Sequence, residues 1–257
     1  MGFLIKWKKS KNNKELNLTG HLTELRNRII ATLVLFFLFF MLGFAFVKDI
    51  YTFFINDIDI DLMVISPTEI IWIYFQMAGV VAITGTIPVL AYQTWAFIRP
   101  GLTSYERRVS LSYIPFIFVL FIIGLVFGYE IFVQFVFPFI LTLSEGMFDV
   151  LITVDRYFKF LFQTIIPFAL LFELPIAAMF LTTLGIITPD YMSRIRKFAY
   201  LALIIISTML TPPDLLMPLL VSFPLILLYE VSIQLSKVVY RKKLEKHEEF
   251  MSQENAV

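Results

Sequence analysis

The sequence predicts an all-α membrane protein with six transmembrane helices, and three observations support this prediction. Of the 257 residues, 59% are hydrophobic and only 16% are charged, against about 25% charged residues in globular domains. The apolar residues form runs long enough to cross a bilayer, and Lys and Arg concentrate in alternate connections between those runs. Because lipid offers the backbone no hydrogen-bond partner, apolar runs of about 20 residues cross it as helices.

Six runs meet this requirement. In chain order they are approximately Ile29–Val47, Glu69–Ala91, Ser112–Val136, Tyr157–Thr183, Ile195–Leu210 and Leu215–Leu235. They divide the chain into a basic arm at 1–28, a transmembrane domain at 29–235 and a polar tail at 236–257. No small-residue cleavage site follows the first run, so we interpret it as a retained span and not as a removed signal peptide.

The fifth run is the shortest. Its 16 residues reach about 24 Å at about 1.5 Å per residue, against a hydrocarbon core of about 30 Å. We therefore expect either local thinning of the bilayer or a helix that lies behind other protein. A tight turn at 211–214 leads to the sixth run, whose helix Asp214 is expected to cap. Aromatic residues in the outer connections at 48–68 and 137–156 predict short helices on the outer surface.

The distribution of Lys and Arg predicts that both termini are cytoplasmic. Seven of these residues lie in the N-terminal arm, three in the second connection, three in the fourth and five in the tail. The other face has only Lys48, Arg156 and Lys159. Since cytoplasmic connections carry the excess of positive charge in multispanning proteins, the more basic face is the inner one.

The composition argues against most catalytic chemistry. The chain has no Cys, which excludes disulfides, thiolate metal sites and thiol nucleophiles. Its two histidines, His21 and His247, lie outside the apolar runs, and no GxxxxGK[ST] phosphate-binding loop is present. A net charge of +1 provides no domain-wide positive field for nucleic acid. We therefore expect no enzyme activity, no catalytic residue, no cofactor and no metal.

A polar motif precedes the first span. Leu22, Leu25 and Ile29 share one face of a helix, while Glu24 and Arg28 stand four residues apart in the order that favours an ion pair. Two interpretations remain open. Either this is a solvated face on which Glu24 pairs with Arg28, or the carboxylate is held at the membrane surface for a cationic partner.

A second polar motif lies in the second cytoplasmic connection. Gly101 can end one helix, and Thr103 followed by Glu106 has the form of a capping box that opens the next. The carboxylate of Glu106 either serves that cap alone or also binds a ligand. Tyr92 and Trp95 are expected in the aromatic belt at the membrane surface.

Glu173 stands near the middle of the fourth span, two residues before Pro175. An ionisable group is costly inside a bilayer, so Glu173 should face the bundle interior or a wet cavity. It either has a functional role or forms a hydrogen bond with backbone that Pro175 leaves unpaired. Gly124 and Gly128 of the third span form a small-xxx-small pair, which predicts close helix packing.

Together these segments resemble the TatC family, the multispanning receptor component of the twin-arginine protein translocase. The similarity covers nearly the whole chain and depends on five motifs in order, at six-span spacing. They are His21-Leu-Thr-Glu-Leu-Arg26, Ser66-Pro-Thr-Glu69, Tyr92-Gln-Thr-Trp-Ala-Phe-Ile-Arg-Pro-Gly101 with Glu106 behind it, Phe172-Glu-Leu-Pro175 and Thr211-Pro-Pro-Asp214.

This resemblance implies a cupped bundle of six helices in the cytoplasmic membrane that binds signal peptides with paired arginines. It also implies single-span partners of the TatA/TatB type, self-association in a larger complex, and outward transport of folded proteins driven by the proton-motive force. The residues that it implies for signal-peptide binding are Leu22, Glu24, Arg26, Phe97 and Glu106. Those that it implies for partner contact or translocation are Glu69, Glu173, Pro175 and Asp214.

Two other classes of membrane protein compete with this assignment. A proton-coupled secondary transporter of a small solute would fit Glu173, the short fifth span and the proline-broken helices. It needs polar groups that converge at the midplane, however, and Glu173 is the only acid there. An intramembrane protease is a weaker rival, because the spans lack the Ser–His or paired Asp residues that it requires.

Overall fold

The secondary structure is helical, as the sequence predicts. The computed structural model describes residues 2–55, 62–144, 151–211 and 216–254, with side chains for 20–55, 62–142, 151–211 and 217–245. The helices are α1 Gly2–Ala45, α2 Val47–Ile55, α3 Pro67–Ile98, α4 Ser104–Ile131, α5 Phe137–Ser144, α6 Val154–Leu171, α7 Leu174–Thr183, α8 Pro189–Arg194, α9 Arg196–Leu210 and α10 Leu216–Glu254. A 3₁₀ turn, Arg99–Gly101, follows α3, and a π-helical turn, Phe132–Val136, connects α4 to α5.

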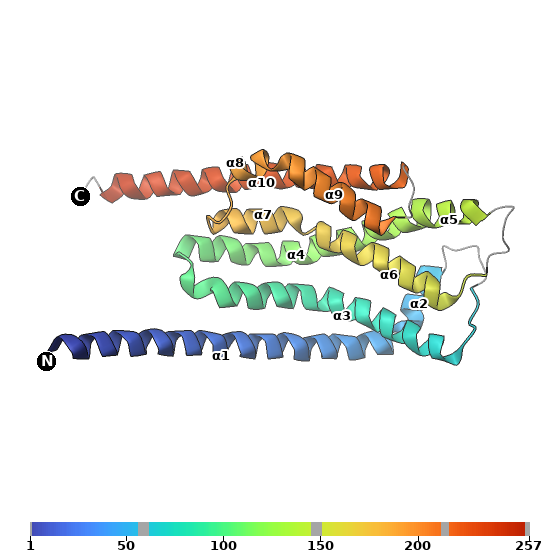
Figure 1. Ribbon diagram of the computed structural model, residues 1–257, viewed down its shortest axis with the longest axis horizontal. Helices are drawn as coiled ribbons and strands as arrows, with labels where there is room; N and C mark the ends of the chain where they lie inside the picture. Colours follow the sequence, from blue (N-terminus) through green and yellow to red (C-terminus); the bar gives the residue numbers. More distant parts are fainter. Residues whose placement is uncertain (1, 56–61, 145–150, 212–215, 255–257) are drawn as a thin grey trace.

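The long helices lie side by side along one axis (Figure 1). α1 packs against α3, α3 against α4, α4 against α6, and α7 against α10, which also contacts α9. α1 therefore forms one edge of the bundle, and α9 with α10 forms the opposite edge. The start of α1, the end of α10 and the α3–α4 turn lie at one end of the bundle, here called the terminal end. α2 and α5 lie toward the other end, the distal end (Figure 1).

Five helical segments are long and apolar enough to cross a membrane. They are Gly20–Ala45, Pro67–Gly101, Ser104–Thr142, Val154–Thr183 and Met217–Glu245. These segments coincide with five of the six predicted spans. The arm and tail boundaries at 28 and 235 fall inside α1 and α10, so the backbone of the polar ends continues the first and last membrane helices without a break.

α9 is the counterpart of the predicted fifth span and is short, with 15 residues. It exposes apolar side chains along its length, and these are Phe198, Leu201, Ile205 and Met209. The described parts of this chain therefore do not enclose α9. Within this chain, the alternative in which the short fifth helix is shielded from lipid by other protein is wrong.

Close packing of α4 on α6 depends on Gly124 and Gly128. A Cβ atom at Gly124 would lie 2.6 Å from the Cα of Ala169, and one at Gly128 would lie 3.0 Å from the Cα of Ile165. The two backbones approach this closely only because neither glycine carries a side chain. The predicted packing role of the glycine pair is confirmed.

The distal end is organised by a contact between the connections at 48–68 and 137–156. α2 and α5 confirm that these connections contain short helices, and α5 continues α4 through the π-helical turn. The N–H of Met63 donates to the carbonyl of Ile152 at 3.1 Å, and the N–H of Val154 donates to the carbonyl of Met63 at 3.0 Å. This bridge joins the segments that precede α3 and α6, and no local sequence pattern predicts it.

Candidate functional site

Glu24 lies on α1 near the terminal end and is already paired with a cation. Its Oε1 accepts hydrogen bonds from Nη2 of Arg28 at 2.5 Å and from Nε at 3.2 Å. Arg28 also donates to Oε1 of Gln93 at 3.1 Å and to the carbonyl of Ala96 at 3.2 Å, both on α3. The predicted Glu24–Arg28 pair is therefore confirmed, and Arg28 additionally joins α1 to α3. The Glu24 side chain remains 37% exposed, and its Oε2 is 3.8 Å from Nδ1 of His21.

An aromatic and apolar surface adjoins Glu24. The ring of His21 stacks on Phe97 of α3 with the ring centroids 4.1 Å apart, a contact that the sequence pattern does not reveal. Leu22 is 64% exposed, and Arg26 is also exposed. Phe97 further lines a cavity of about 360 Å³ between α1 and α3. Of the residues predicted for this part of the site, Glu24 and Phe97 are thus linked through His21, while Leu22 and Arg26 are available at the surface.

Glu106 lies in the first turn of α4 and forms the predicted capping box. The N–H and Oγ1 of Thr103 donate to Oε2 of Glu106 at 3.1 and 2.9 Å, and the N–H of Glu106 donates to Oγ1 of Thr103 at 3.3 Å. These reciprocal bonds orient the carboxylate at the start of the helix. The Glu106 side chain is only 14% exposed, so it is far better shielded from water than Glu24.

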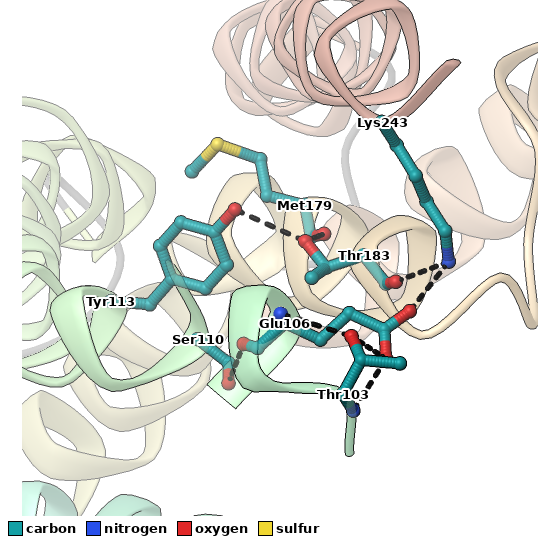
Figure 2. Close-up of polar contacts among 7 residues, drawn as sticks. All are labelled: Thr103, Glu106, Ser110, Tyr113, Met179, Thr183 and Lys243. Atoms are coloured by element: carbon teal, nitrogen blue, oxygen red, sulfur yellow. Dashed lines mark hydrogen bonds and ion pairs between the residues drawn. The ribbon is translucent and has the colours of Figure 1, made fainter. Parts of the chain in front are cut away.

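A second interaction holds Glu106, and it comes from the other end of the chain (Figure 2). Nζ of Lys243 on α10 donates to Oε1 of Glu106 at 2.8 Å and to the carbonyl of Thr183 at 2.7 Å. Thr183 is the last residue of α7, so one ammonium group joins α4, α7 and α10. No local pattern distinguishes Lys243 from the other basic residues of the tail, because 137 residues separate it from Glu106.

Glu24 and Glu106 flank the C-terminal part of α3. The Glu24 cluster contacts α3 from α1. From α4, the indole Nε1 of Trp95 donates to Oγ of Ser110 at 3.0 Å, and Ser110 in turn donates to the carbonyl of Glu106 at 2.5 Å. Trp95 is only 5% exposed, so its expected place in the aromatic belt is wrong. An indole can be buried here because Ser110 satisfies its N–H group.

Glu173 occupies the break between α6 and α7, where its N–H bonds to the carbonyl of Leu170 at 3.1 Å. The interruption follows from Pro175, which is buried and lacks the N–H that a continuous helix needs. Both carboxylate oxygens of Glu173 are buried, and neither has a hydrogen-bond partner among the described residues. Glu173 itself lines a cavity of about 250 Å³, together with residues of α3, α4 and α7. The expectation that Glu173 faces the bundle interior is confirmed, and the alternative hydrogen bond to freed backbone is not formed.

A short series of contacts connects this cavity with the Glu106 network. Tyr113 lines the cavity beside Glu173. Its hydroxyl group is 3.1 Å from Oγ1 of Thr183, and the carbonyl of the same Thr183 accepts the ammonium of Lys243 (Figure 2). Lys243, Thr183 and Tyr113 therefore connect Glu106 to the cavity that Glu173 lines.

The remaining predicted site residues are not part of this end. Glu69 lies at the distal end in the first turn of α3, where its Oε2 accepts a hydrogen bond from the N–H of Ile65 at 3.2 Å. Asp214 lies outside the described residues. The structure thus brings Glu106 and Glu173 into one connected region, places Glu24 across α3 from them, and leaves Glu69 apart.

The terminal end can bind cations. Two carboxylates there already hold a cation from within the chain, Arg28 at Glu24 and Lys243 at Glu106. Hydrogen bonds between such groups are charge-assisted and short, and the same geometry suits a guanidinium or ammonium group of a ligand.

Sequence and structure comparisons agree on one family. A family model described as "Sec-independent protein translocase protein (TatC)" matches residues 20–224. The Sec-independent protein translocase protein TatCd of Bacillus subtilis (strain 168) is 48% identical over 233 residues, which cover 91% of this chain and 96% of that protein. TatCy of the same organism is 41% identical, with 89% of this chain and 91% of that protein covered. A crystal structure of the twin-arginine translocase receptor TatC in DDM has a TM-score of 0.74 at 31% identity, and the match covers 84% of this chain and 99% of that one.

Proposed function

Because this chain belongs to the TatC family, and is therefore a protein translocase component and not an enzyme, we propose that its terminal end is the receptor surface for twin-arginine signal peptides. The observation that carries this proposal is the pair of carboxylates, Glu24 and Glu106, each presented at the terminal end with a cation bound to it. Two adjacent arginines of an extended peptide take one carboxylate each. The apolar part of the peptide packs beside the exposed Leu22 and the ring of Phe97.

The chemistry of the two side chains favours arginine. A guanidinium group presents a planar fork that can donate two hydrogen bonds to one carboxylate, whereas lysine is a point charge on a flexible stem. Glu106 contributes more than Glu24, because its side chain is 14% exposed against 37% for Glu24. Ion pairs gain strength as water is removed from them.

Selectivity for arginine is the direct test of this proposal. We expect the purified protein to bind a peptide with an Arg-Arg pair on the order of tenfold more tightly than the same peptide with Lys-Lys, since both carry the same charge but only arginine can form the forked pair. Titration of labelled peptides in detergent measures both affinities, and raising the salt concentration controls for nonspecific attraction. Equal affinities for the two peptides would leave the recognition proposal without support.

The proposed topology has six spans, with both termini in the cytoplasm. α9 supplies the fifth span in chain order, which adds to the five long apolar segments, and the membrane adapts to its 15 residues by local thinning. The support for the orientation is the Lys and Arg distribution, in which 1–28, 236–257 and two connections carry all but three of these residues. In this arrangement the terminal end, with Glu24 and Glu106, faces the cytoplasm, where signal peptides are presented before export.

Cysteine accessibility tests this orientation. The chain has no native Cys, so Ser104→Cys and Thr142→Cys each create a unique label site at an exposed position on opposite ends of the bundle. In sealed cells a membrane-impermeant maleimide should react with the Cys at position 142 and not with the one at position 104. In inside-out vesicles the two reactivities should exchange. Labelling of position 104 from outside the cell would refute the model.

Single-span subunits of the TatA/TatB type are the proposed partners, and Glu173 is their proposed contact. Its carboxyl oxygens are buried without a partner among the described residues, and the residue lines a cavity between α3, α4 and α7. The rival transporter function finds little support at the same cavity, because its lining holds no Lys, Arg or second acid to coordinate a solute. The translocase therefore stays the preferred function.

A further inference from the structure

We propose that Lys243 is a resident cation that occupies the Glu106 carboxylate in the free receptor and is exchanged for an arginine of the signal peptide. This inference extends the proposed recognition site and rests on it. Lys243 thereby lowers the affinity of the receptor for the signal peptide, although it does not contact the bound peptide.

The first argument is the number of acceptor positions on Glu106. The two oxygens of a carboxylate offer about four lone-pair positions. Thr103 occupies two of them at Oε2 through its N–H and hydroxyl groups, and Lys243 occupies one at Oε1. A forked guanidinium pair needs free positions on the carboxylate, so it cannot form fully while all three contacts persist. One of the resident donors must leave.

Lys243 is the donor best able to leave. The Thr103 bonds are local and close the start of α4, whereas Lys243 reaches Glu106 on a long flexible side chain that is 32% exposed. Its departure in exchange for an arginine also conserves charge, so the shielded carboxylate is never left without a cation. Such an uncompensated buried charge is strongly unfavourable.

A second acceptor keeps Lys243 nearby after the exchange. Its Nζ also bonds to the carbonyl of Thr183 at 2.7 Å, at the C-terminus of α7, where the helix dipole favours a cation. Gly185 lies beside this contact: it has a φ of +76°, which favours glycine, and a Cβ there would lie 3.3 Å from Nζ. α10 itself remains docked during the exchange, because Ser236 bonds to Thr182 at 2.6 Å.

Competition by a resident cation has a defined thermodynamic signature. A ligand that must displace Lys243 has its affinity reduced by the fraction of receptor in which Glu106 is free. Removal of Lys243 should therefore strengthen binding, and it should do so by the same factor for an Arg-Arg and a Lys-Lys peptide. A residue that only stabilised the fold would have the opposite effect or none.

The test compares Lys243→Gln with Lys242→Gln in the full-length protein. Glutamine keeps a donor for Thr183 but removes the charge, and the neighbouring Lys242 is an exposed residue of the same charge. We expect Lys243→Gln to tighten the binding of both peptides about tenfold, as expected for the loss of one competing charge-assisted hydrogen bond, while Lys242→Gln binds like the parent protein. Unchanged or weaker binding by Lys243→Gln, or a gain for one peptide alone, overturns the exchange.

A second measurement keeps the proposal testable if Lys243→Gln fails to fold. A spin label on Glu245→Cys, in the otherwise cysteine-free and unaltered chain, reports the mobility of α10 beyond Lys243. Addition of the Arg-Arg peptide should increase that mobility modestly, since the turns of α10 beyond Ser236 lose the contact to Glu106 and keep, among the described residues, only the hydrogen bond from Lys243 to Thr183. Binding without a change in mobility overturns the proposal. Failure of the recognition site itself is separate, because it would appear as unchanged peptide binding in Glu106→Gln.

Discussion

Glu106→Gln is expected to lower the affinity for a twin-arginine peptide by about a hundredfold. Glutamine has nearly the size of glutamate and still offers an oxygen to Thr103, so the capping box can persist. What is lost is the charge, at a side chain only 14% exposed, where removal of one member of a shielded ion pair costs about 3 kcal/mol or more. Peptide titration with the purified variant measures the change.

Glu130→Gln is the matched control for this substitution. Glu130 lies at the opposite end of α4 from Glu106, accepts a hydrogen bond from Gln134 in the π-helical turn, and has no place in the proposed site. The same peptide should bind this variant with parental affinity. Glu24→Gln should also weaken binding, by a smaller factor, because its carboxylate is more exposed. Double-mutant cycles with single Arg→Lys peptides complete the test. Coupling energies of zero at both residues would mean that Glu106 serves only the capping box and Glu24 only its ion pair with Arg28.

Glu173→Ala is expected to abolish transport while leaving signal-peptide affinity within about twofold of the parent protein. A carboxylate whose two oxygens are buried without a partner among the described residues is poised to accept a hydrogen bond from a polar group on a partner helix. Loss of one hydrogen bond to a buried side chain weakens an association by on the order of tenfold. Export of a reporter protein and site-specific cross-linking to the single-span subunits measure the two consequences.

The control for Glu173→Ala is Glu173→Gln, which retains the size of the side chain and one acceptor oxygen. If the carboxylate acts as a hydrogen-bond acceptor, Glu173→Gln should keep more cross-linking than Glu173→Ala, and both should be produced at parental levels. Parental transport and cross-linking in Glu173→Ala would mean that the side chain has no part in partner contact and merely occupies the helix break before Pro175.

The sequence by itself determined those features that depend on local geometry. The length of each apolar run predicts its helix, because hydrocarbon leaves the backbone no other way to satisfy its hydrogen bonds. The Thr103–Glu106 cap and the Glu24–Arg28 pair follow from fixed spacings of three and four residues along a helix, and both are present. The close approach at Gly124 is likewise a property of one short motif.

Only the tertiary structure decided which faces of the helices meet. In a bilayer the side chains that contact lipid are as apolar as those that contact protein, so hydropathy cannot separate the two. For that reason Trp95 was expected at the membrane surface but is buried against Ser110. For the same reason nothing in the order of residues pairs Lys243 with Glu106, although this contact between distant segments occupies the proposed recognition site. Such contacts depend on how complete helices pack against one another, and a local pattern contains no information about that packing.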